Sequence, residues 1–179
     1  MKLKLLLTGN ELMTGDTLDS NSAMIAKMSL DAGIQVNYKA TVSDDLDQLV
    51  SEISRLSESS DVLIVNGGLG PTSDDLTAEA LAIAMNVELE EHPVAIKHLV
   101  EWCTKRNYGL SEANRKQANL PKGVEIVANA SGSAVGFKIR LNDCLIVCTP
   151  GVPHELKTMM AQEILPQLSE LLPNTHQPK

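Results

Sequence analysis

The stretch of this sequence best suited to chemistry is NGGLGPTSDD, residues 66–75, which joins an apolar segment to a helix-forming one. Gly67, Gly68 and Gly70 allow the chain to turn sharply, and without a Cβ they let a ligand approach the main chain. A helix is predicted to begin directly after this turn, and its free N–H groups and dipole favour an anion there. The segment therefore predicts a loop that holds phosphate.

The same loop carries hydroxyl and carboxylate groups whose role the spacing leaves open. Thr72 and Ser73 could donate hydrogen bonds to phosphate, whereas a simple tight turn would use Ser73 or Asp74 only to cap the helix. The loop matches neither a Walker loop nor the GxGxxG dinucleotide fingerprint. Asp74 and Asp75 would repel phosphate unless a cation intervenes, and Mg²⁺ is commonly held by one or two carboxylates plus ligand phosphates. We therefore expect a divalent metal, the alternative being that both aspartates only complement the helix dipole.

The elements that position this loop alternate between strand and helix through the first half of the chain. A continuous apolar run at residues 62–65 predicts a strand that is buried on both faces, and apolar residues at helical spacing predict helices. This order is typical of a parallel sheet with right-handed crossovers, so we expect an α/β fold. The expected strands are residues 3–8, 34–42 and 62–65, and the expected helices are residues 19–32, 45–56 and 76–85.

The second half of the chain is less regular, and we interpret the whole as one domain over residues 1–172 followed by a loose tail at residues 173–179. A closing helix is expected at residues 156–172, kinked or broken at Pro166. A helix over residues 93–106 should turn Val94, Ile96, Leu99, Val100 and Cys103 inward. The other expected elements are a short helix within SEANRKQANLP, a hairpin of residues 124–128 with 136–141, and a buried strand at 144–148.

Polar groups follow four of the expected strands, in the segments TGNELMTG, VSDDLD, NGGLGPTSDD and TPGVPHE. Ligands of open α/β sheets bind outside the carboxyl ends of the strands, so the agreement of four exits predicts a site at this edge. One of Asp44 and Asp45 should cap a helix while the other could face the cleft, and Asp19 could simply cap the first helix. Of the four histidines only His154 follows a strand, which makes it a weak candidate.

The composition excludes several classes of function. With a net charge of −8 and 2% aromatic residues, the chain lacks the basic patch and the stacking platforms of a nucleic-acid binder. Three cysteines without a CxxC pair predict reduced thiols that fill the core. No apolar run reaches the roughly 20 residues that span a bilayer, and no signal peptide is visible. We expect a cytoplasmic protein that binds neither nucleic acid nor membrane.

Taken together, TGNELMTGDTLDSN, VSDD, NGGLGPTSDDLT, NRKQANLP and TPGVPHEL resemble the N-terminal domain of the CinA (competence/damage-inducible) family, within the molybdopterin-binding, MoaB/MogA-like fold. The resemblance runs from Lys4 to about Leu168 and implies a three-layer α/β/α domain with a mostly parallel sheet. In the molybdopterin-binding relatives, an Asp after the second strand and an Asp before a Thr in the glycine loop are functional. These positions match Asp44 and Asp75, with Thr77 following.

The strand exits and the resemblance together assign the site. The expected catalytic residues are Glu11, Asp44 and Asp75, and Asp44 and Asp75 are also expected to hold Mg²⁺, Mn²⁺ or Co²⁺. The expected ligand is a phosphorylated small molecule, ADP-ribose or a molybdopterin-like compound, with no organic cofactor required. The expected ligand contacts are Gly9, Asn10, Asp19, Gly67, Gly68, Leu69, Gly70, Pro71, Thr72, Ser73, Asp74, Thr77, Pro150, Gly151, Pro153 and Glu155.

The resemblance implies metal-dependent ADP-ribose pyrophosphatase activity, which CinA-like proteins are associated with. The alternatives are a non-catalytic module that binds molybdopterin or a nucleotide in molybdenum cofactor metabolism, and a domain used for protein contacts. Relatives of this fold often form dimers or trimers, which also allows a homo-oligomer. The turn GSAVG, residues 132–136, departs from the family's frequent Gly-Thr-Ala-Pro-Gly at Val135. The amidohydrolase activity that many relatives carry in a second domain is not assigned to this chain.

Overall fold

A central sheet of six strands organises residues 1–173, which the computed structural model describes. Its strand order is β2-β1-β3-β8-β7-β6; the first four strands are parallel, and β7 is antiparallel to both of its neighbours. The predicted α/β fold with a mostly parallel sheet is confirmed. The strands are β1 (Leu3–Thr8), β2 (Val36–Val42), β3 (Val62–Asn66), β6 (Glu125–Val127), β7 (Gly136–Leu141) and β8 (Cys144–Thr149).

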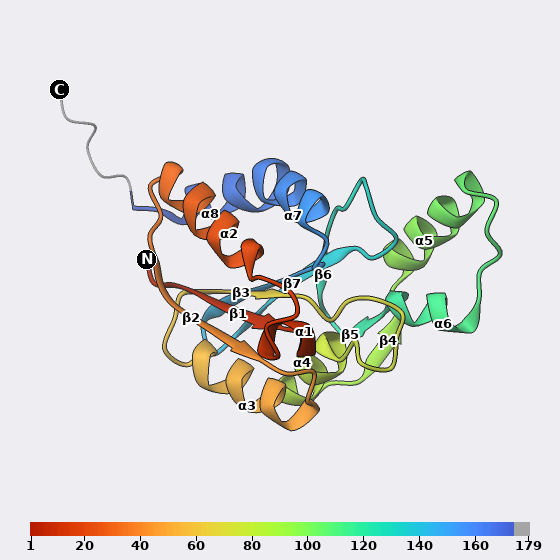
Figure 1. Cartoon of the computed structure of the whole chain (residues 1–179), viewed down its shortest axis with the longest axis horizontal. Helices are drawn as coiled ribbons and strands as arrows, with labels where there is room; N and C mark the ends of the chain where they lie inside the picture. The colour runs from red at the N-terminus through yellow and green to blue at the C-terminus, as the bar shows by residue number, and fades with distance from the viewer. Residues whose placement is uncertain (174–179) are drawn as a thin grey trace.

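Helices cover both faces of the sheet, which gives three layers (Figure 1). Successive residues of a strand point to opposite faces, so on β1 Leu5 and Leu7 enter one apolar core and Leu6 enters the other. Because both faces are covered, β3 is apolar along its length until Asn66. The helices of one face are α2 (Ser20–Asp31), α7 (Pro153–Met159) and α8 (Leu165–Leu171), and those of the other include α3 (Leu46–Ser57) and α4 (Thr77–Met85).

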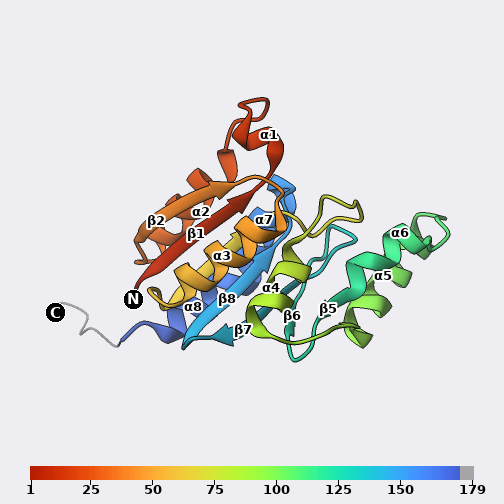
Figure 2. The ribbon, with the colours of Figure 1, turned by 90° about the horizontal axis from the view of Figure 1, so that it is seen from below.

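A small lobe projects from the β8-β7-β6 half of the molecule (Figure 2). In it a two-stranded antiparallel ribbon of β4 (Leu89–Glu91) and β5 (Asn119–Pro121) lies beside α5 (Pro93–Lys105) and α6 (Glu112–Arg115). The sequence did not predict this ribbon, because strands of three residues are too short to show an alternating pattern.

The predicted helix over residues 93–106 is present as α5, but the prediction of its inward-facing residues was partly wrong. Val94 and Val100 are exposed, whereas Ala95, Leu99 and Cys103 are buried. A projecting helix packs along a narrow stripe only, so apolar residues outside that stripe remain in solvent.

The closing helix is not broken at Pro166, where a kink or break was expected. The chain passes from α7 through a π-helical segment, Met160–Ile164, directly into α8. Pro166 lies in the first turn of α8, where a missing backbone N–H costs least. The wider π-helical turn therefore precedes the proline, and the helix runs on past it.

The hairpin of β6 and β7 is confirmed, and Cys103, Cys144 and Cys148 are all buried, as core-filling thiols should be. No helix among residues 1–173 is long and apolar enough to cross a membrane. The predicted loose tail lies outside the described residues, apart from Pro173.

Candidate functional site

A cavity of about 850 Å³ opens at the carboxyl ends of β1, β3 and β8. In the sheet, β2 is the neighbour of β1 on one side and β3 is its neighbour on the other side. The site therefore lies where the strand order reverses, the usual place for a ligand in an open α/β sheet. Its volume is within the range of about 300–1,000 Å³ that holds small molecules.

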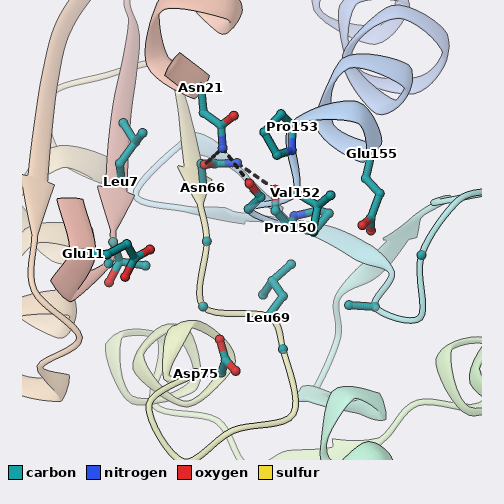
Figure 3. A pocket seen from close by; sticks show the side chains of 18 of the residues that line it. Leu7, Glu11, Asn21, Asn66, Leu69, Asp75, Pro150, Val152, Pro153 and Glu155 are labelled. Atoms are coloured by element: carbon teal, nitrogen blue, oxygen red, sulfur yellow. Dashed lines mark hydrogen bonds between the residues drawn. The ribbon is translucent and has the colours of Figure 1, made fainter. Parts of the chain in front are cut away.

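The glycine loop after β3 forms the floor of this cavity (Figure 3). Gly67 and Gly68 have φ angles of +102° and +72°, which side-chain-bearing residues rarely adopt. A Cβ on Gly67 would lie 2.7 Å from the Thr8 carbonyl oxygen, and one on Gly68 would collide with the Thr77 hydroxyl. These two glycines are therefore required by the turn itself.

Thr77 holds the loop instead of lining the cavity. Its side chain is fully buried, and its hydroxyl donates to the Gly67 carbonyl oxygen at 2.8 Å. The expected ligand contact of Thr77 is therefore not supported, and Asn10 and Ser73 also lie outside the cavity lining. Neither Ser73 nor Asp74 caps α4, because the N-cap position is Leu76 and has no side-chain cap.

Asp75 is built into the loop that it follows. Its Oδ2 accepts hydrogen bonds from the Thr72 backbone N–H at 2.9 Å and from the Thr72 hydroxyl at 2.8 Å. Gly70 makes room for it, because a Cβ there would lie 2.6 Å from the same oxygen. Lys116 fastens the loop from outside by donating to the carbonyl oxygens of Thr72 and Asp75. No hydrogen bond to Asp75 Oδ1 is present among residues 1–173, so this oxygen is left for a ligand.

Asp44 and Asp45 divide their roles as the sequence suggested. Asp45 caps α3 by accepting from the Gln48 N–H at 2.9 Å, and Asp44 lines the cavity. Both carboxylate oxygens of Asp44 are held, one by the Thr8 hydroxyl at 2.9 Å and the other by the Asn10 N–H at 3.2 Å. Asp44 is therefore a fixed negative charge at the exit of β2.

Glu11 and Glu155 lie on opposite sides of the cavity, with Leu69 and the glycine loop between them (Figure 3). Glu11 belongs to the short helix α1 (Asn10–Met13) and folds back over Gly9, where a Cβ would lie 2.6 Å from its Oε1. Its carboxylate is exposed and accepts no hydrogen bond from residues 1–173. Of the predicted catalytic carboxylates, Glu11 has the greatest freedom to act on water.

Glu155 is buried at the start of α7, where Asn129 Nδ2 donates to its Oε1 at 2.7 Å. Gly132 packs against the same carboxylate, because a Cβ on Gly132 would collide with it. Gly132, Ser133 and Ala134 line the cavity, whereas Val135 points into the core. The residue that departs from the family pattern, Val135, therefore lies outside the cavity lining.

Asn66 and Asn21 join the exits of β3 and β8. Asn66 Nδ2 donates to the Thr149 hydroxyl at 3.0 Å and to the Pro150 carbonyl oxygen at 2.9 Å. Asn21 Nδ2, at the start of α2, donates to Asn66 Oδ1 at 3.0 Å and to the Gly151 carbonyl oxygen at 2.8 Å (Figure 3). This network sets the position of Pro150, Gly151 and Pro153 at the wall of the cavity.

Sequence reasoning missed the wall that the lobe contributes. Trp102 of α5 and Gln117, in the 3-10 turn η1 (Lys116–Ala118), both line the cavity. The segment NRKQANLP was interpreted as part of a short helix and of a family resemblance, and nothing in the local sequence says that the lobe folds back to the glycine loop. Gly132, Ser133 and Ala134 of the turn GSAVG also line the cavity, and the lining residues that were not singled out are Leu7, Thr8, Leu12, Thr17, Leu18, Ser20, Asn21, Asn66, Ser131 and Val152.

The cavity is acidic, and this decides what it could hold. Six carboxylates line it, namely Glu11, Asp19, Asp44, Asp74, Asp75 and Glu155, but no Lys or Arg among residues 1–173 does so. Asp19 is engaged as the cap of α2. No three His, Cys, Asp or Glu side chains of the described chain cluster closely enough to form a metal site by themselves. The donor set thus fits a hard cation held by one or two carboxylates and completed by ligand phosphates.

The fold and the sequence both match known proteins. The structure superposes on the crystal structure of CinA from Thermoplasma acidophilum with a TM-score of 0.82 and 30% identity, covering 90% of this chain and 95% of that one. Residues 4–170 match the family described as a probable molybdopterin binding domain. The chain belongs to the CinA family. The domain is also 58% identical over 173 residues to a CinA-like protein of Colwellia psychrerythraea and 44% identical over 170 residues to one of Escherichia coli.

This CinA-family chain spans about 40% of the length of those curated relatives while 95–97% of it is aligned. It also shares its fold with the molybdopterin biosynthesis enzyme MoaB of Thermus thermophilus, with a TM-score of 0.60 at 18% identity. That match covers 95% of this chain and 94% of MoaB, and at this identity it speaks to the fold alone.

Proposed function

We propose that this CinA-family domain binds a phosphorylated nucleotide or pterin and hydrolyses the pyrophosphate bond of ADP-ribose in a metal-dependent reaction. One observation carries the proposal: the backbone N–H groups of Gly68, Leu69 and Gly70 have no hydrogen-bond partner among residues 1–173, and all three residues line the cavity. Consecutive free amides in a glycine turn are a common means of binding phosphate oxygens.

The carboxylates supply the reason for a metal. A pyrophosphate entering a cavity lined by six carboxylates meets strong repulsion, and no lining Lys or Arg offsets it. A divalent cation between the phosphates and Asp44 or Asp75 would remove that repulsion and neutralise the charge that develops during hydrolysis.

The protein's own groups divide the remaining work. The amides of the glycine loop hold the phosphoryl oxygens in place. Glu11, whose carboxylate is unpaired, accepts a proton from the water that attacks phosphorus. The bridging P–O bond then breaks, and ADP-ribose and water yield AMP and ribose 5-phosphate.

A second candidate is a module that binds a molybdopterin-like compound without turning it over. The similarity in fold to MoaB favours it, and the same amides and carboxylates would serve it. The two candidates differ in turnover alone.

The test is a panel of ADP-ribose, NAD, FAD and nucleotide sugars with Mg²⁺, Mn²⁺ or Co²⁺, analysed for released mononucleotide. We expect AMP from ADP-ribose, no AMP with EDTA, and at least a hundredfold slower release from Glu11→Gln. Glu58→Gln, which removes an exposed carboxylate at the end of α3, is the matched control and should retain full activity. Tight binding without turnover of any compound would favour the binding module, and no binding of any compound would refute both candidates.

A further inference from the structure

Three buried polar atoms at the cavity have no hydrogen-bond partner. Among residues 1–173, four buried side-chain polar atoms lack a partner, and Asn21 Oδ1, Trp102 Nε1 and Gln117 Oε1 belong to residues that line the cavity. Buried polar groups are nearly always hydrogen-bonded, so each exception calls for a partner that the protein does not itself supply. Gln117 is 9% exposed, which leaves its side-chain oxygen little access to bulk water.

Trp102 and Gln117 belong to one wall of the cavity, opposite the exit of β1. His98, one helical turn before Trp102, donates from Nε2 to the Gly132 carbonyl oxygen at 2.7 Å. Gln117 Nε2 donates to the Ser133 hydroxyl at 3.1 Å. Helix α5 and the turn η1 are thus both hydrogen-bonded to the loop that contains Gly132 and Ser133. The indole N–H and the Gln117 side-chain oxygen remain unpaired.

The Trp102 ring is held by two neighbouring side chains, one of which covers a face of the ring. The Arg106 guanidinium carbon lies 4.1 Å from the ring centroid, and the Tyr108 ring centroid is 6.2 Å away. These contacts hold the indole in one orientation. The indole N–H is buried without a partner, so recognition by this residue depends on a hydrogen-bond acceptor.

We propose that Trp102 Nε1 and Gln117 Oε1 form a subsite for the heterocyclic base of the ligand, with the indole donating to an acceptor on the edge of the base and the glutamine oxygen accepting from an amino or ring N–H group on that edge. Nucleobases and pterins share this chemistry, because their edges carry a donor and an acceptor side by side. The glycine loop holds the phosphate end of the same molecule, so this inference rests on the proposed function. Both subsite groups are uncharged, as recognition of a neutral ring requires.

The chain contains a single tryptophan, so its fluorescence reports on this subsite without a label. With Mg²⁺ present and excitation of the indole alone, we expect AMP, GMP and a phosphorylated pterin to change the emission. Ribose 5-phosphate and inorganic pyrophosphate, which have no nucleobase or pterin, should bind without changing it. The ring-bearing ligand with the highest affinity then distinguishes a nucleotide from a pterin.

Two substitutions test the hydrogen bonds in calorimetric titrations. Trp102→Phe keeps an aromatic ring but removes the donor, and Gln117→Met keeps the length but removes the acceptor. Each should weaken the binding of AMP, or of whichever ring-bearing compound binds best, by roughly tenfold and leave the affinity for ribose 5-phosphate unchanged. Ser133→Ala is the matched control, because it breaks the same Gln117–Ser133 bond while sparing the Gln117 oxygen. It should weaken ring binding less than Gln117→Met does.

The outcomes separate this inference from the proposed function. If no ring-bearing phosphate binds, both are refuted. If such ligands bind but the wild-type emission stays constant, and every folded variant binds them normally, only the subsite is refuted. Equal losses from Ser133→Ala and Gln117→Met would also overturn it, because tethering of the loop would then explain the effect. The fluorescence titration uses the wild-type chain, so it decides the matter even if a variant does not fold.

Discussion

Adding one methyl group to Gly68 should have a different consequence from adding one to Gly70. At Gly68 the φ angle is +72°, and the new Cβ would lie 3.2 Å from the Thr77 Cβ and 3.3 Å from its backbone nitrogen, besides colliding with its hydroxyl. Thr77 is fully buried at the first turn of α4, so it cannot move aside. Backbone strain and overpacking together should lower the free energy of unfolding of Gly68→Ala by about 2–4 kcal/mol.

Gly70 has no left-handed φ angle, and its Cβ would meet only the carboxylate of Asp75, at 2.6 Å from Oδ2. A side-chain end can rotate away, at the cost of its hydrogen bonds to Thr72. We expect Gly70→Ala to lower the free energy of unfolding by about 1 kcal/mol. The displaced Asp75 and reshaped amides should nevertheless reduce ADP-ribose affinity or turnover by about a hundredfold, as a misplacement near 1 Å can.

Thermal unfolding and calorimetric titration with ADP-ribose and Mg²⁺ measure the two effects. About 1 kcal/mol corresponds to about 2–4 °C in a domain of this size, so Tm should fall by roughly 4–16 °C for Gly68→Ala and by less than about 4 °C for Gly70→Ala. A double-mutant cycle supplies the control: in an Asp75→Ala background, Gly70→Ala should have little further effect on stability. A wild-type Tm for Gly68→Ala, or normal ligand binding by folded Gly70→Ala, would refute the reasoning.

Three further predictions follow from the same geometry. Asp75→Asn keeps an oxygen that can accept from Thr72, so Tm should change by less than about 3 °C while hydrolysis falls at least tenfold; full activity would show that Asp75 only shapes the loop. Lys116→Met removes the donor to two loop carbonyls and should weaken ligand binding without touching the ligand, an effect that Lys116→Arg should partly restore; an unchanged affinity in folded Lys116→Met would exclude this clamp. Burial raises the pKa of the Cys148 thiol, and of Cys144, above the usual range, so the folded state retains protons that the unfolded state loses. Stability should be complete below the ordinary cysteine pKa, near 8.5, and should decline as pH rises above it, which urea midpoints at neutral and alkaline pH would show; Cys148→Ala should reduce the decline.

Much of the fold could be predicted because its signals are local. β1 and β3 are largely apolar segments, and each helix between β1 and β3 has its own cap, Asp19 or Asp45. Parallel topology follows from that alternation, and it places the strand exits at one edge. The glycine loop was recognisable because a turn with positive φ angles must be made from glycine.

The roles within the site were decided by contacts between distant segments. The same motif contains three residues with different roles. The turn requires Gly68, Thr77 is buried beneath the turn, and Asp75 reaches the cavity. Their spacing in the sequence does not show which of them contacts a ligand. The difference arises because Thr77 faces the Gly67 carbonyl and Asp75 faces Thr72, and these orientations depend on how α4 packs against the sheet.

The lobe shows most clearly what could not be predicted from the sequence. Trp102 and Gln117 are 15 positions apart in the sequence and more than 25 beyond the glycine loop, yet they form part of the same cavity. No local pattern predicts this, because the hydrogen bonds from His98 to Gly132 and from Gln117 to Ser133 join α5 and η1 to a loop that follows them in the chain. Local propensity and periodicity were sufficient to predict the sheet and the glycine loop. The wall that faces this loop could be found only from the folded chain, because long-range packing creates it.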